Sequence, residues 1–163
     1  MKRITTLKAV LIVVAFTLLA GVPSGAYAPG SKLSLAITCP TQPASDPIFS
    51  FLLTNHGSAP VEVADTQVPI DIMVHLTVQD ANGTSVQPGV YFSGTRSAQA
   101  PRMLQPGQSL PLKDWVDHSQ PQTSAIPLHL FGYKLAPGTY EVSARATDSP
   151  DEPPSNVCKV TII

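Results

Sequence analysis

Basic residues are scarce in this sequence: the 163-residue chain carries ten, against eleven acidic residues. Three of the ten, Lys2, Arg3 and Lys8, lie near the N-terminus; without them seven basic residues remain against eleven acidic ones, a net charge near −4. Nucleic-acid-binding domains carry a basic patch or stripe, and attachment to anionic lipid needs a cluster of lysines and arginines. The charge balance therefore indicates neither a nucleic-acid partner nor a membrane-surface attachment.

The sequence also lacks the short motifs of common catalytic and metal sites. It has no Gly-x-Ser-x-Gly element, which would expose a nucleophilic serine, and its four histidines never occur in the HExxH spacing. The two cysteines are too far apart for a zinc knuckle. Asp114 and Asp117 flank Trp115, and a polar strand end explains them more simply than a pair of catalytic carboxylates does. We therefore expect neither enzymatic activity nor a cofactor.

One group of residues leaves a metal site open as an alternative. Asp71, Met73 and His75 share the outward side of a predicted strand from Ile70 to Gln79, and carboxylate, thioether and imidazole groups can bind copper or zinc. Residues 116–118 could add further ligands. A solvated strand face with ordinary polar residues explains the same pattern. We favour that interpretation because a metal-binding spacing is missing, so no metal site is predicted.

The N-terminus has the pattern of a secretory signal peptide. A basic start precedes an apolar run from Ala9 to Ala20, and Ala26-Tyr27-Ala28 follows. The run is shorter than the roughly 20 residues of a transmembrane helix, whereas a short apolar core before an Ala-x-Ala sequence is typical of a signal peptide. An uncleaved membrane anchor is the alternative. We expect a signal peptide over residues 1–28, one domain over residues 29–163, and a secreted or periplasmic location.

Proline is abundant, with 17 residues in the chain, and Pro-Gly turns precede alternating segments. In the clearest of these, residues 135–148, the side chains of Tyr140, Val142, Ala144 and Ala146 alternate with polar residues after Pro137-Gly138. A period of two indicates a strand with one buried face, which requires a second sheet to cover it. Further strands are expected at residues 32–39, 48–55, 61–63, 70–79, 84–87 and 156–162. We predict an all-β fold, an immunoglobulin-like antiparallel β-sandwich of about seven to nine strands.

The segments between these strands have weaker patterns. Residues 80–83, Asp-Ala-Asn-Gly, predict a hairpin turn. Residues 88–105 are the least regular stretch, with a short strand suggested at 90–93. A strand is expected from the Pro106-Gly107 turn through Trp115, which we place in the core. Residues 117–126 are expected to form a loop, and residues 128–133 a short edge strand.

The two cysteines, Cys39 and Cys158, are expected to form a disulfide. Alternation places each on the inward side of its strand, and inward pairs in oxidising compartments usually bond. Two buried free thiols are the alternative. Cys39 ends its strand and Cys158 begins its own, so directly registered parallel neighbours would keep them apart. A bridge between them therefore requires that the two strands are offset in register, that they run antiparallel, or that they lie in different sheets.

Four segments together resemble the bacterial BsuPI-type intracellular proteinase inhibitor domain: LTNHGSAPVEV, VQDANG, LQPGQSLPLKDW and LAPGTYEVSA. The resemblance covers roughly residues 48–147, and the matching residues are mostly turn and core positions. The resemblance implies an immunoglobulin-like sandwich and adds protease inhibition to the candidate functions. This chain departs from the family because we expect it to be exported, whereas the family's namesake is intracellular, and because residues 88–105 match no family pattern. No inhibitory residues can therefore be carried over.

The loops at the ends of a sandwich are the usual place for recognition, because the sheets hold them while their sequences vary. Residues 88–105 are the first candidate and residues 114–126 the second. The first contains residue types enriched at interface hot spots, and we predict partner binding by Tyr91, Phe92, Arg96 and Arg102. We expect a monomeric, non-enzymatic module that binds another protein, with a protease among the candidates. The alternatives are an envelope or adhesion accessory domain and a periplasmic copper- or zinc-binding sandwich.

Overall fold

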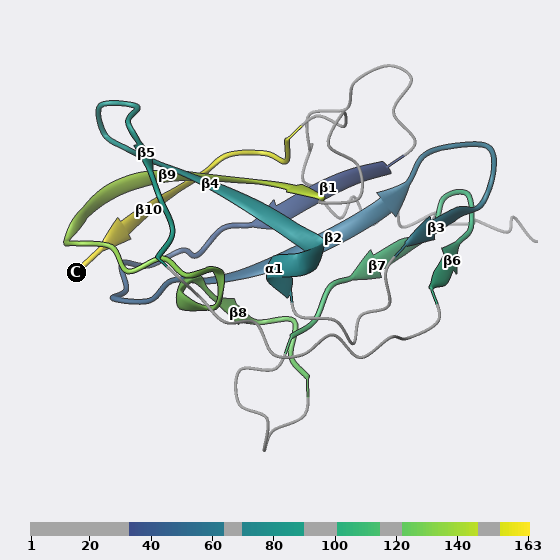
Figure 1. Ribbon diagram of the computed structural model, residues 1–163, viewed down its shortest axis with the longest axis horizontal. Coiled ribbons are helices and arrows are strands. Elements are labelled where there is room, and N and C mark those ends of the chain that lie inside the picture. Colours follow the sequence, from purple (N-terminus) through teal and green to yellow (C-terminus); the bar gives the residue numbers. More distant parts are fainter. Residues whose placement is uncertain (1–32, 64–69, 90–100, 115–121, 147–153) are drawn as a thin grey trace, which may run out of the picture.

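The computed structural model describes residues 33–63, 70–89, 101–114, 122–146 and 154–163. Within these residues it contains two antiparallel sheets, a separate two-stranded ribbon and two short helical turns (Figure 1). The described part of the chain has ten strands, more than the seven to nine expected, because pairings of only two or three residues are included. The predicted signal peptide lies outside the described residues.

The first sheet has the strand order β1-β2-β7. Strand β2 (Ile48–Asn55) lies at its centre, between β1 (Leu33–Thr38) and β7 (Ser109–Pro111), and β8 (Ile126–Pro127) pairs with its first residues. The alternation predicted from the sequence is confirmed: every second residue of β1 and β2 is buried, namely Leu33, Leu35, Ile37, Phe49, Phe51, Leu53 and the polar Asn55.

The second sheet has the order β10-β9-β4-β5. Strand β9 (Gly138–Ala146) pairs with β10 (Cys158–Ile162) on one side and β4 (Val74–Asp80) on the other, and β5 (Ser85–Val86) continues from β4. Its inward residues include Val74, Val78, Val142 and Cys158, each at most 1% exposed. The Tyr140 hydroxyl donates to the carbonyl oxygen of Ala136 at 3.0 Å, so this tyrosine fixes the turn before its own strand.

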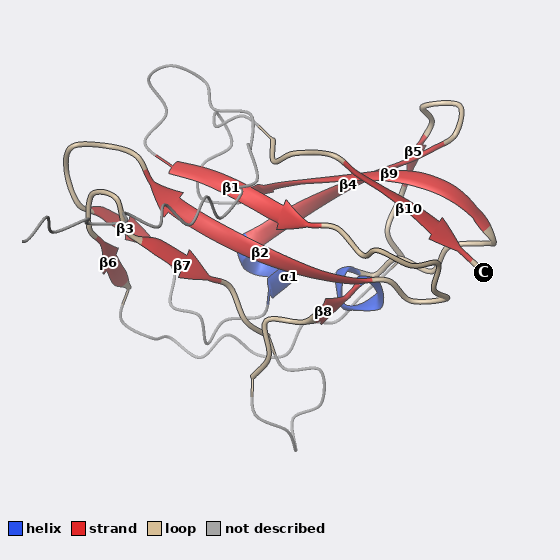
Figure 2. Ribbon diagram, turned by 180° about the vertical axis from the view of Figure 1, so that it is seen from behind, coloured by secondary structure: helices blue, strands red, loops and turns tan. Residues whose placement is uncertain are grey.

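The two sheets lie one over the other, as Figures 1 and 2 show from opposite sides. Their inward side chains form one hydrophobic core, in which the Phe51 and Phe131 rings meet edge to face with centroids 5.6 Å apart. Antiparallel sheets packed in this way are the architecture of the immunoglobulin-like sandwich. The predicted fold class is confirmed.

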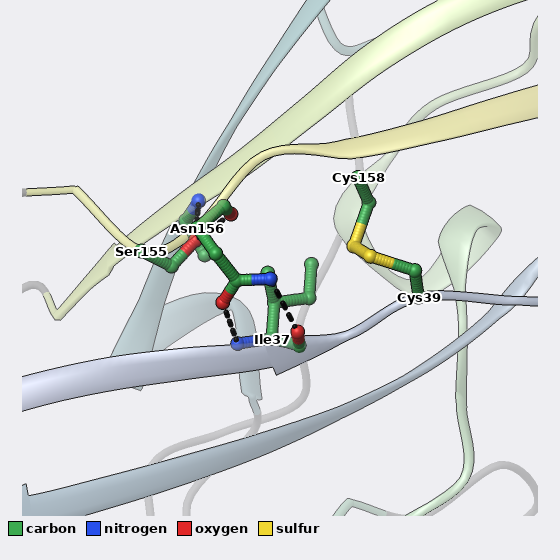
Figure 3. Close-up of a disulfide and its surroundings, with 6 residues drawn as sticks. Ile37, Cys39, Ser155, Asn156 and Cys158 are labelled. Carbon is green, nitrogen blue, oxygen red and sulfur yellow. Dashed lines mark hydrogen bonds between the residues drawn. A yellow bond between two sulfur atoms is a disulfide. The ribbon is translucent and has the colours of Figure 1, made fainter. Parts of the chain in front are cut away.

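A disulfide between Cys39 and Cys158 ties the two sheets together (Figure 3). Cys39 directly follows β1 in the first sheet, and Cys158 opens β10 in the second. Of the three geometries that the sequence left open, the structure has the crossing between sheets. Beside the bridge, the Asn156 side chain accepts from the Ile37 N–H at 3.1 Å and donates to the Ile37 carbonyl at 2.9 Å.

The strand predicted from Ile70 to Gln79 is wrong in its first part. Residues Ile70–Met73 form the helical turn α1, and the strand begins only at Val74. Ile70 and Met73 are both buried, a spacing of three residues that one helical turn places on one side. The turn is held by a distant residue, because Asp114 Oδ2 accepts from the Ile70 N–H at 2.9 Å.

The edge strand predicted at residues 128–133 is also wrong. Leu128–Phe131 form the 3-10 helix η1, which buries Leu128, Leu130 and Phe131 and ends at Gly132 with φ of 79°. The strand expected through Trp115 ends at Pro111, with a single bridge from Asp114 to Thr123 beyond it; Trp115 lies outside the described residues. No helix in the described ranges is long and apolar enough to span a bilayer.

Candidate functional site

Of the four predicted partner-binding residues, the structure describes one. Arg102 is exposed and begins β6 (Arg102–Leu104), which pairs with β3 (Val61–Val63). The sequence did not predict β6. Tyr91, Phe92 and Arg96 lie outside the described residues, in the segment that precedes this strand.

The β3–β6 pair presents an exposed surface of mixed character. Met103 is 48% exposed and lies opposite Glu62 in the antiparallel register, and Arg102 lies opposite Val63. Because successive side chains of a strand point to opposite sides, Glu62 and Met103 share one side of the ribbon and Arg102 lies on the other. We call these three exposed residues the ribbon surface. Sequence reasoning missed Met103, because a three-residue strand after an irregular segment has too few positions to show a period.

A buried asparagine fixes the end of this ribbon. Asn55, which is fully buried, donates through Nδ2 to the carbonyl oxygens of Ala59 at 2.9 Å and Leu104 at 2.8 Å. Its Oδ1 accepts from the Gly57 N–H at 2.8 Å. One side chain therefore satisfies three backbone groups, in the loop before β3 and at the last residue of β6.

The backbone of Asn55 anchors the adjoining turn. Asn55 N–H donates to the Gln108 carbonyl at 3.0 Å, and Gly107 N–H donates to the Asn55 carbonyl at 2.8 Å. Gly107 has φ of 75°, a backbone conformation that glycine adopts at little cost. The turn predicted at Pro106-Gly107 is thereby joined to the last residue of β2, and the ribbon surface rests on a fixed backbone.

The residues considered for a metal site do not share a strand face. Because residues 70–73 are helical, Met73 turns into the core and is 7% exposed, whereas His75 is exposed on β4. Among the described residues, no group of three or more histidine, cysteine, aspartate or glutamate side chains could hold a metal ion. Asp114 has a structural role as the acceptor for Ile70, and Asp117 lies outside the described residues.

Asp71 and His75 instead line one recess of about 200 Å³. Phe131 and Tyr133 form another part of its wall, together with Pro88 and Gly89. The Tyr133 hydroxyl donates to the Leu76 carbonyl at 3.0 Å, and burial raises the pKa of the Tyr133 phenol above its ordinary value of 10.0. Asp71 Oδ1 is buried in the protein and accepts no hydrogen bond from it.

A second recess, of about 340 Å³, lies at the β4–β5 hairpin and includes Asp80, Tyr140, Glu141 and Lys159. Asp80 Oδ1 accepts from the backbone N–H groups of Asn82 and Thr84, both at 2.9 Å. The bonds from Thr84 and then Asn82 lower the pKa of Asp80 below its ordinary value of 3.8. This carboxylate stabilises the predicted hairpin turn, in which Gly83 has φ of 78°, and its role is structural.

Comparison with known proteins adds little to this geometry. No protein-family model matches the chain, and neither does any curated protein. Among solved structures, the chain is similar to the CARDB domain of a Pyrococcus furiosus protein, crystallised in complex with di-metal ions. The two are 14% identical over 80% of this chain and 87% of that one, with a TM-score of 0.36. The assignment of the immunoglobulin-like fold rests on the strand pairing described above.

Proposed function

We propose that this chain is an exported, non-enzymatic module that binds another protein through the ribbon surface and the segment leading into it. One observation carries the proposal: Arg102 and Met103 are exposed on a strand whose end is fixed by the buried Asn55. Arginine and methionine are enriched in protein interfaces. A surface held rigid before binding loses less conformational entropy when a partner docks.

Export is part of the same proposal. The N-terminal pattern is typical of a signal peptide, and the Cys39–Cys158 disulfide suits an oxidising compartment. The resemblance to the BsuPI-type inhibitor domain makes an extracytoplasmic protease the first class of partner to test. An envelope or adhesion protein is the alternative partner on the same surface.

The test measures partner affinity for protein recovered from a secretion-competent host. Purified serine, cysteine and metalloproteases are titrated with it, and saturable inhibition at one-to-one stoichiometry is the expected result for the protease partner. Saturable binding to an envelope or adhesion protein, with no inhibition of any of the proteases, would identify the alternative class of partner.

Two variants connect the binding to the ribbon surface. Arg102→Ala and Met103→Ala are each expected to weaken partner binding at least tenfold, the loss typical of interface hot spots, with unchanged thermal stability. Lys159→Ala and Val157→Ala are the matched controls, because both residues are exposed near or in β10 of the second sheet. Equal affinities for all four variants would contradict the proposal.

A further inference from the structure

The sulfur-containing side chains of the predicted mature domain differ widely in exposure. Residues 29–163 contain four of them, Cys39, Met73, Met103 and Cys158, and the structure describes all four. The two cysteines form the disulfide, so neither offers a free thiol. Met73 is packed in the hydrophobic core and is 7% exposed, whereas Met103 on β6 is 48% exposed. An oxidant that attacks reduced sulfur therefore meets one accessible side chain on the folded domain, that of Met103.

Met103 lies where an added oxygen atom changes the surface of the protein rather than its core. Strand β6 is at an outer edge of the molecule (Figure 2), and Met103 lies directly opposite Glu62 in the register of the ribbon. Side chains that face each other in this way are close enough to interact. The Glu62 carboxylate offers only hydrogen-bond acceptors, and the oxygen of a sulfoxide is a further acceptor. Oxidation therefore replaces the apolar part of this side of the ribbon with a second acceptor group.

The reaction is a two-electron transfer of oxygen from a peroxide to the thioether sulfur. The sulfur of Met103 attacks one oxygen of hydrogen peroxide, the O–O bond breaks and an S–O bond forms. The proton of the transferred oxygen passes to the departing oxygen, which leaves as water. The sulfur is oxidised to the sulfoxide and the peroxide is reduced. The product is a polar side chain in place of a flexible apolar one, a change that disrupts methionine contacts in interfaces.

We propose that Met103 is the site at which peroxides oxidise the folded protein, and that its sulfoxide weakens binding at the ribbon surface. The assignment of the site depends only on the exposure of the sulfur-containing side chains. The effect on binding rests on the function proposed above. Because Met103 lies outside the core, its oxidation leaves the fold intact, and binding by the ribbon surface becomes sensitive to oxidants.

The site is tested by treating the folded protein with hydrogen peroxide and following the masses of its proteolytic peptides over time. Met103 is expected to gain one oxygen atom at least about seven times faster than Met73, which is the ratio of their exposures, 48% to 7%. In protein unfolded with guanidinium the two residues are expected to react at similar rates. Equal rates in the folded protein, or faster oxidation of Met73, would overturn the assignment whatever the protein binds.

The effect on binding is measured by titrating the purified proteases named above with untreated protein and with peroxide-treated, desalted protein. Met73→Leu keeps the core volume nearly constant and leaves Met103 as the reactive sulfur; its inhibition is expected to weaken about tenfold on treatment, as at an interface hot spot. Met103→Leu is expected to show the same inhibition before and after treatment.

Two further outcomes separate this effect from the proposed function itself. Complete oxidation of Met103 with unchanged inhibition would overturn the effect on binding. Arg102→Ala then tests the ribbon surface by a side chain that the sulfoxide does not alter. If Arg102→Ala also binds with unchanged affinity, the proposed function fails, while the peptide masses still decide the oxidation site.

Discussion

At the scale of single residues, two buried polar side chains hold segments that lack regular backbone hydrogen bonds to a neighbouring strand. Asn55 connects the loop before β3 to the end of β6, and Asp114 holds the first residue of α1. Both are buried among apolar residues, where an unpaired polar group would be costly. Their hydrogen bonds position the ribbon surface and the recess at Asp71, so the proposed binding surface depends on a residue that takes no part in binding.

Replacing Asn55 with alanine is expected to destabilise the protein by about 2–4 kcal/mol. The buried Leu104 carbonyl loses its partner at a cost of roughly 1–3 kcal/mol, and two part-buried backbone groups, which water can reach, lose theirs at a smaller cost. The three groups are Gly57 N–H and the carbonyls of Ala59 and Leu104. Urea denaturation of both proteins gives the difference. The control is Thr161→Ala on the exposed side of β10, for which a change within about 0.5 kcal/mol is expected. A similarly small change for Asn55→Ala would show that the loop and ribbon do not depend on this side chain.

At the scale of elements, side chains bond to strand backbone groups that have no partner on a neighbouring strand. Asn156 pairs with both backbone groups of Ile37 on β1, and Tyr133 donates to the Leu76 carbonyl on β4. Unpaired strand edges are templates for association with other chains. These contacts use backbone groups that an added strand would need, and this arrangement favours the monomer that we predict.

The β4–β5 hairpin provides a prediction of pH dependence. The folded-state pKa of Asp80 lies below its ordinary value of 3.8, chiefly because of the N–H bonds from Thr84 and Asn82. The charge of Asp80 therefore contributes stability that is fully present above the unfolded-state pKa and disappears as the pH falls through the folded-state pKa.

We expect Asp80→Asn to lower the melting temperature at pH 7 and to have progressively less effect below about pH 4, near the unfolded-state pKa of an aspartate. Thermal melts of both proteins at intervals between pH 2 and pH 7 measure this difference. A difference in melting temperature that stays constant over the whole range would assign the effect of the substitution to something other than the charge.

At the scale of the whole molecule, one covalent bond connects the first and last strands. Cys39 and Cys158 are 119 residues apart in sequence, and their bridge crosses from one sheet to the other. Nearly the whole described domain lies within the closed loop. In the chain-entropy model the effect of a cross-link on the unfolded state increases with loop length.

The double variant Cys39→Ala, Cys158→Ala is expected to be less stable by about 4–5 kcal/mol, the value that the chain-entropy model gives for a loop of this length. Guanidinium denaturation measures the loss. Treating the unaltered protein with reductant should lower its midpoint to a similar extent, whereas the double variant should not respond to reductant. A variant as stable as the unaltered protein would show that core packing alone maintains the sandwich.

Sequence pattern predicted much of this fold. The bounds of β2 and β3 agree with prediction, β1, β9 and β10 lie within the predicted segments, and the disulfide and the turn at residues 80–83 are confirmed. These features are local: alternation follows from the pleat of a single strand, and a turn follows from the backbone freedom of glycine. The predicted partner-binding residues stay a prediction, since the structure describes only Arg102 among them.

Long-range contacts decided the rest. Residues 70–79 alternate as a strand would, yet the first four form a helical turn that Asp114, 44 residues away, holds by its Ile70 bond. The recess likewise brings Asp71 and His75 together with Phe131 and Tyr133. The spacing of these residues along the chain does not predict that they line one recess. Local pattern thus settled most of the extended segments and the side of each that is buried, but not residues 70–73 and 128–131, which are helical. Folding alone settled which distant segments meet, because that choice depends on packing and hydrogen bonds between residues far apart in the chain.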